Sequence, residues 1–149
     1  MKGEEQMAIQ QLTVFVENRR GCLAKITGLL ADHQIDMRAL SIADTRDFGI
    51  LRLIVSDTEK ALDVLKRENI LVQITDVIGV RLSDQPGELS GVLTALDQAE
   101  INVEYLYAFL TRSEKNAYVV LRVENNETAA EILRGAGFRM VEKEDLKAL

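Results

Sequence analysis

The segment Asp84-Gln85-Pro86-Gly87-Glu88-Leu89 marks the point where one hydrophobic periodicity gives way to another. Before it, Ile78, Val80 and Leu82 alternate with other residues, which predicts a strand with one buried face. After it, apolar residues recur at helical spacing, at Leu89, Val92, Leu93 and Leu96. The segment therefore predicts a glycine-containing loop between a strand and an amphipathic helix.

The same pattern occurs 66 residues earlier, around Asn18-Arg19-Arg20-Gly21-Cys22-Leu23. In this alignment Gly21 matches Gly87, and Leu23 matches Leu89. After a two-residue insertion near Ser113, the halves continue to match at an offset of 68. Because the match extends over most of both halves, it indicates two copies of one structural unit.

Each half continues with the same predicted elements. Two extended runs follow the first helix, at 35–44 and 48–56 in the first half and at 101–111 and 117–124 in the second. A second helix comes next, with Asp57 as its N-cap in the first half and Asn125 or Asn126 in the second. The last strands are 71–74 and 139–141. This order is the split βαβ pattern of ferredoxin-like sandwiches.

We therefore predict an α+β fold of two ferredoxin-like (βαββαβ) units, at 9–75 and 76–145. Each unit should have four antiparallel strands with two helices on one face. The span 70–82 must serve as the last strand of one unit and the first strand of the next. Since a unit of about 70 residues has a marginal core, we expect the two units to be packed together.

The loop segments carry a resemblance to a known family. The segment 84–89 resembles the D-x-P-G-x-L signature of the ACT domain family, and the segment 18–23 is similar to an N-x-x-G-x-L variant of it. The resemblance covers nearly the whole chain and implies a stand-alone tandem ACT-domain protein. Members of this family bind small ligands, most often amino acids, and regulate an enzyme or a transporter allosterically without being catalysts themselves.

The loop chemistry fits that role. The first turn of a helix has unpaired N–H groups and partial positive charge, which suit the carboxylate of an amino acid. Asn18 or Asp84 can then accept from the ammonium group. The candidate ligand-binding residues are Asn18, Arg19, Arg20, Gly21, Cys22, Leu23, Asp84, Gln85, Pro86, Gly87, Glu88 and Leu89. The competing interpretation is structural: each glycine makes a tight turn, and Asn18 and Asp84 form Asx turns or helix caps.

The two loops differ in charge. The first carries Arg19 and Arg20, whereas the second carries Asp84 and Glu88. A carboxylate should therefore prefer the first loop, which we predict to be the stronger site. The formal net charge of −6 disfavours a purely anionic ligand over long range and favours a zwitterion.

Composition excludes several classes of protein. Hydrophobic residues make up 47% and charged residues 28%, which is typical of soluble globular proteins, and the acidic balance argues against nucleic-acid binding. The single cysteine excludes an internal disulfide and a cysteine-based zinc site. No apolar run of about 18 residues and no signal peptide is present, so we expect a cytoplasmic protein without membrane contact.

We expect no catalytic residue, no metal and no cofactor, because the sequence offers no nucleophile–base pair, phosphate-binding loop or metal cluster. Two classes remain: an amino-acid sensor, and a regulatory subunit that acts through protein contacts. The first loop also resembles that of acetolactate synthase small subunits. Those subunits have a different C-terminal domain, whereas the C-terminal half of this chain repeats the ACT loop.

We also predict a homodimer. Apolar residues such as Phe15 and Val77 fall on the sheet faces opposite the helices, and small units need further burial. Tyr105, Tyr107 and Phe109 share one strand face, which favours an interface or a core over a pocket wall.

Overall fold

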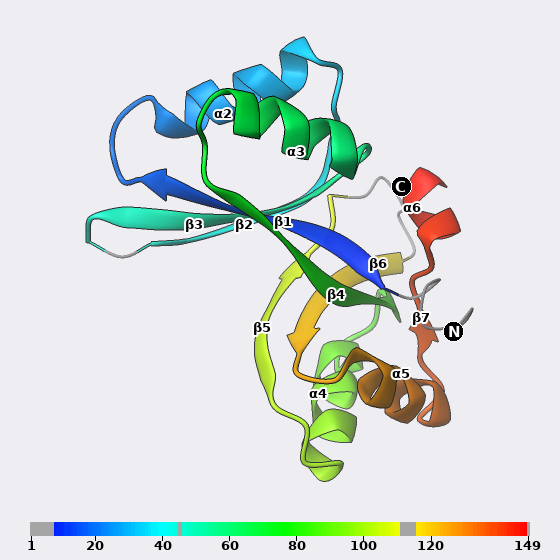
Figure 1. Ribbon diagram of the computed structural model, residues 1–149. Coiled ribbons are helices and arrows are strands. Elements are labelled where there is room, and N and C mark those ends of the chain that lie inside the picture. The colour runs from blue at the N-terminus through cyan, green and yellow to red at the C-terminus, as the bar shows by residue number, and fades with distance from the viewer. Residues whose placement is uncertain (1–7, 45, 111–115, 149) are drawn as a thin grey trace. The chain divides into compact units, whose positions relative to one another are not determined.

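The computed structural model describes residues 8–44, 46–110 and 116–148 (Figure 1). The chain divides into two compact units. The N-terminal unit is Gln10–Thr75, and the C-terminal unit comprises residues 8–9 and the described residues from Asp76 onward. Each unit has the predicted order of elements, so the predicted α+β fold of two βαββαβ units is confirmed. Thr111 and the insertion near Ser113 lie outside the described residues.

Six elements form the N-terminal unit. They are β1 (Ile9–Glu17), α2 (Cys22–Asp32), β2 (Met37–Asp44), β3 (Phe48–Val55), α3 (Thr58–Arg67) and the start of β4 (Val72–Ser83). The strand β3 pairs antiparallel with β1 and β2, and β1 has β4 as its other neighbour. The two helices lie side by side over one face of this sheet (Figure 1). Between helices and sheet lies the first core, whose fully buried members include Leu12, Val14, Leu30, Leu53 and Leu65.

The C-terminal unit repeats this arrangement. It contains the rest of β4, then α4 (Glu88–Gln98), β5 (Val103–Ala108), β6 (Asn116–Val123), α5 (Asn126–Gly135), β7 (Arg139–Met140) and α6 (Lys143–Ala148). The strand β4 pairs with β6 and β7, and β5 pairs with β6. Its own core includes Ile78, Leu96, Leu121 and Leu133. None of the described helices is long and apolar enough to span a membrane.

The second helix of each unit begins at a side-chain cap. The carboxylate of Asp57 accepts a hydrogen bond from the Lys60 N–H at 3.1 Å. The amide oxygen of Asn125 accepts one from the Thr128 N–H at 3.0 Å. The predicted caps Asp57 and Asn125 are therefore confirmed, and Asn126 is the first residue of α5 instead.

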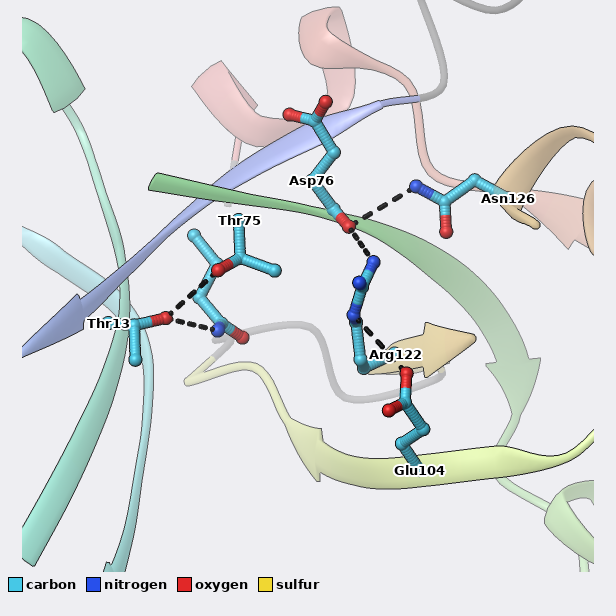
Figure 2. Close-up of polar contacts among 7 residues, drawn as sticks. Thr13, Thr75, Asp76, Glu104, Arg122 and Asn126 are labelled. Atoms are coloured by element: carbon cyan, nitrogen blue, oxygen red, sulfur yellow. Dashed lines mark hydrogen bonds and ion pairs between the residues drawn. The ribbon is translucent and has the colours of Figure 1, made fainter. Parts of the chain in front are cut away.

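The strand β4 contributes residues to both units, as the sequence predicts (Figure 2). In the N-terminal unit the hydroxyl oxygens of Thr13 and Thr75 lie 3.2 Å apart. In the C-terminal unit the Asp76 carbonyl accepts from the Arg122 guanidinium at 3.0 Å and from the Asn126 amide at 3.2 Å. Thr75 and Asp76 are thus consecutive residues of β4, but each is hydrogen-bonded to residues of a different unit.

Two sequence expectations about the sheet faces have different outcomes. The rings of Tyr105 and Tyr107 stack with their centroids 6.4 Å apart, and both Tyr107 and Phe109 are buried like core residues. Val77, by contrast, has no exposed surface. Its predicted use as an apolar surface for a second copy is therefore wrong, because its side chain is already covered within the chain.

Candidate functional site

The two predicted loops have almost the same backbone. Gly21 precedes α2 with φ 90° and ψ −14°, and Gly87 precedes α4 with φ 89° and ψ −6°. This left-handed conformation is one that glycine adopts without steric cost. A Cβ atom added at either position would meet no atom within 4 Å. The backbone turn therefore requires glycine at both positions, and the space beside each glycine is open.

Neither helix that follows a loop has a side-chain cap. The Cys22 N–H reaches the Arg19 carbonyl at 3.3 Å, and the Glu88 N–H reaches the Gln85 carbonyl at 3.4 Å, so both bonds are long. The interpretation of Asn18 and Asp84 as helix caps is therefore wrong. The first turn of each helix keeps the partial positive charge of uncapped N–H groups.

The side chains of the first loop form a charged pair. A guanidinium nitrogen of Arg19 lies 3.3 Å from a carboxylate oxygen of Glu17, and both side chains are largely exposed. A hydrogen bond with the Cys22 side chain, together with the negative charge of Glu17, raises the pKa of Arg19 above its ordinary value. Arg19 therefore remains cationic beside the start of α2.

The second loop has a side-chain hydrogen bond where the first loop has an ion pair. The hydroxyl of Ser83 donates a hydrogen bond to the Glu88 carboxylate. Glu88 occupies the position that Cys22 has in the first loop, and both are half-buried. The remaining predicted residues of this loop are exposed; they are Asp84, Gln85, Pro86, Gly87 and Leu89. A negative side chain therefore lies beside the second helix start, where the first loop has a thiol.

A groove of about 420 Å³ runs beside the first loop. Its lining includes Glu17, Arg19 and Cys22, and also the connection 68–71 between α3 and β4. Of the six residues predicted in this loop, only Arg19 and Cys22 line the groove. The other four are exposed beside it; they are Asn18, Arg20, Gly21 and Leu23. The structure thus joins part of the predicted loop to a segment far along the chain.

Several groove residues were not predicted from the sequence. Phe48 enters because it pairs with Glu17 across β1 and β3, and it is 46% exposed. Leu71 enters because its carbonyl accepts from the Phe15 N–H at 3.0 Å, and it is 63% exposed. Lys25 lies one helical turn into α2. A comparison of the two repeats could have pointed to these groove residues, because the C-terminal repeat has different residue types at the matching positions.

Comparison with known families decides what kind of unit this is. A family model described as an ACT domain pair matches residues 7–149. The chain belongs to the ACT domain pair family. Each βαββαβ unit is accordingly an ACT unit, and the predicted membership in the ACT domain family is confirmed.

Solved structures resemble this ACT domain pair over most of their lengths. Protein BT0572 from Bacteroides thetaiotaomicron is 38% identical, with a TM-score of 0.90 over 97% of this chain and 99% of that one. The ligand-free regulatory subunit of aspartate kinase from Thermus thermophilus is 16% identical, with a TM-score of 0.64 over 89% and 95%. The regulatory subunit from Thermus flavus is 17% identical, with a TM-score of 0.61 over 87% and 93%. The two subunits share the fold with this chain. A search of curated proteins finds no match.

Proposed function

We propose that this ACT domain pair is a non-catalytic regulatory protein that senses an amino acid or a similar small carboxylate. The observation that carries the proposal is the uncapped start of α2 beside a groove that also holds the cationic Arg19. Uncapped N–H groups and a guanidinium are both suited to a carboxylate. Family membership adds support, since ACT domains bind small ligands in many regulatory proteins.

In this proposal the first loop is the stronger site. The carboxylate binds the N–H groups around Gly21, Cys22 and Leu23, and the Asn18 side chain accepts from the ammonium group. The second loop would use Gly87, Glu88 and Leu89 with Asp84, but the Glu88 carboxylate beside the helix start opposes an anion there. The difference in charge between the loops thus favours binding at the first.

A matched pair of glycine substitutions tests this assignment. A thermal-shift screen with all twenty amino acids first identifies a ligand, since a ligand that binds only the native state raises the melting temperature. Gly21→Val should then weaken that ligand's binding about tenfold or more, because loss of hydrogen bonds to a charged group costs about 1.5–3 kcal/mol. Gly87→Val imposes the same backbone strain in the other unit and should leave the affinity near that of the wild type.

Isothermal titration calorimetry measures the affinities, and circular dichroism checks that both variants are folded. Wild-type affinity in both folded variants would show that the loops are structural turns only. A loss confined to Gly87→Val would place the site in the second loop instead of the first.

The proposal includes a homodimer in the cytoplasm. The edge strand β2 exposes Leu40 and Ile42, at 42% and 47% of their surface, which leaves apolar area for a second copy. Light scattering at micromolar concentration should give twice the chain mass of 16.7 kDa. The replacement of Ile42 by Lys should shift the mass toward that of one chain, whereas a wild-type mass of 16.7 kDa would contradict the dimer.

A second candidate function is that of a regulatory subunit bound to a catalytic enzyme. The aspartate kinase regulatory subunits share this fold over nearly their whole length, which supports the candidate. In that case the exposed apolar residues of β2 would contact the enzyme and not a second copy. The light-scattering mass of the isolated chain separates the two, because an enzyme contact alone leaves the chain monomeric.

A further inference from the structure

The groove beside the first loop has an apolar wall at one end of the N-terminal sheet. Phe15 is half-buried, while Phe48 and Leu71 keep 46% and 63% of their surface exposed. These side chains come from β1, from the start of β3 and from the connection before β4. An exposed group of large apolar side chains that line one concavity is typical of a binding surface.

The C-terminal unit shows that the fold does not require an apolar residue at the position of Phe48. In the N-terminal unit Phe48 pairs with Glu17, the last residue of β1. The corresponding pair in the C-terminal unit joins Asn116 to Ser83. The same strand pairing is therefore built with a polar residue in one repeat and with an exposed phenylalanine in the other.

The neighbouring position shows the same contrast. The Phe15 N–H donates to the Leu71 carbonyl at the edge of the groove. The corresponding residues of the C-terminal unit are paired arginines, Arg81 and Arg139. The apolar wall is thus confined to the repeat that holds the groove, although both repeats have the same topology.

The charges of the groove are balanced. Arg19 is paired with Glu17, while Lys25 and Glu68 form no ion pair with the described residues. Lys25 can therefore add its positive charge to the carboxylate contacts at the start of α2, and Glu68 can pair with the ammonium group in addition to Asn18. One cation and one anion beside an apolar wall complement a zwitterion that carries an apolar side chain.

We propose that the groove binds the side chain of a hydrophobic amino acid, of the size of leucine or phenylalanine, against Phe15, Phe48 and Leu71. This inference rests on the proposed amino-acid sensing and adds the ligand class. The groove volume of about 420 Å³ is at the small end of the range for ligand pockets, which is about 300–1,000 Å³. Polar amino acids of similar size do not gain from the apolar wall.

Titration calorimetry with four probes tests the ligand class. L-leucine and L-phenylalanine should bind about tenfold or more tightly than L-asparagine, which is close to leucine in size, because only they bury apolar surface. 4-Methylpentanoate, which is leucine without its amino group, should bind more weakly than leucine because Glu68 then lacks its cation. Asparagine binding as tightly as leucine would overturn the inference.

Substitutions copied from the other repeat test the apolar wall. Leu71→Arg introduces the residue type found at Arg139, and it should weaken leucine binding about tenfold. The control Leu110→Arg makes the same change at a residue that is 57% exposed and outside the groove, and it should leave binding unchanged. Phe48→Asn, which copies Asn116, provides a second variant if the first does not fold.

The outcomes separate this inference from the proposed function. If a polar amino acid binds, and Gly21→Val but not Leu71→Arg weakens it, the sensing function stands and the apolar class is wrong. If leucine binding is the same in Leu71→Arg, Phe48→Asn and wild type, the wall has no role and the inference is overturned. If no amino acid binds, both proposals fail.

Discussion

The replacement of Leu53 by alanine is expected to lower the free energy of unfolding by about 2–5 kcal/mol. Leu53 lies in β3, an inner strand of the N-terminal sheet, paired with Leu12 on one side and Leu40 on the other. It has no exposed surface and belongs to the first core. Its truncation therefore removes buried apolar surface and leaves a cavity in a closely packed interior.

Leu106 provides the control for this prediction. It lies on the edge strand β5, pairs with the fully buried Leu121 and is itself 37% exposed. Leu106→Ala should therefore change the free energy of unfolding by less than about 1 kcal/mol. Urea denaturation followed by circular dichroism measures both variants, and equal losses would show that burial of the side chain does not govern the cost of its truncation.

Gly79→Ala is expected to destabilise the C-terminal unit by about 1–3 kcal/mol, by overpacking. A Cβ atom at Gly79 would lie 2.9 Å from Cδ1 of Ile9 and 2.9 Å from Cβ of Val141. The isoleucine tip can rotate away, but the Cβ of Val141 cannot move without its backbone. That backbone is fixed, since the Val141 N–H donates to the Gly79 carbonyl at 2.8 Å.

The control for Gly79→Ala has the opposite expected sign. Gly28 lies inside α2, and a Cβ atom there would meet nothing within 4 Å. Gly28→Ala should stabilise the protein by about 0.5–1 kcal/mol, because alanine has the higher helix propensity. Thermal unfolding by calorimetry measures both, and a Gly79→Ala variant as stable as wild type would contradict the close packing at β4.

Much of the fold could be predicted because its signals are local and occur twice. Alternation at Ile78, Val80 and Leu82 marked β4, and helical spacing from Leu89 onward marked α4. The match between Gly21 and Gly87 aligned the two halves, and their nearly equal backbone angles agree with that alignment. A periodicity seen in two independent copies is more informative than either copy alone.

The sheet faces were harder to predict. The sequence pattern predicts that Val77 is an apolar residue on an exposed strand face, but its side chain is completely buried. Alternation indicates which residues share a face, but it does not show what covers that face. The homodimer proposal consequently depends on Leu40 and Ile42, whose exposure only the tertiary structure reveals.

The candidate site was predicted in part. The sequence identified the glycine loops because a strand followed by glycine and a helix is a local pattern. It did not identify Phe48, Leu71 or Glu68 as groove residues. They lie 20 residues or more along the chain from the first loop. Strand pairing brings Phe48 to it, a backbone hydrogen bond brings Leu71, and Glu68 follows from the end of α3.

Residue types at short spacing are enough to predict the two βαββαβ units, their connecting loops and the ACT family resemblance. They are not enough to predict that the first loop adjoins a groove with an apolar wall. Such a groove is formed by side chains from separate strands and turns. Their proximity is set by the register of the sheet, and no local pattern encodes that register completely.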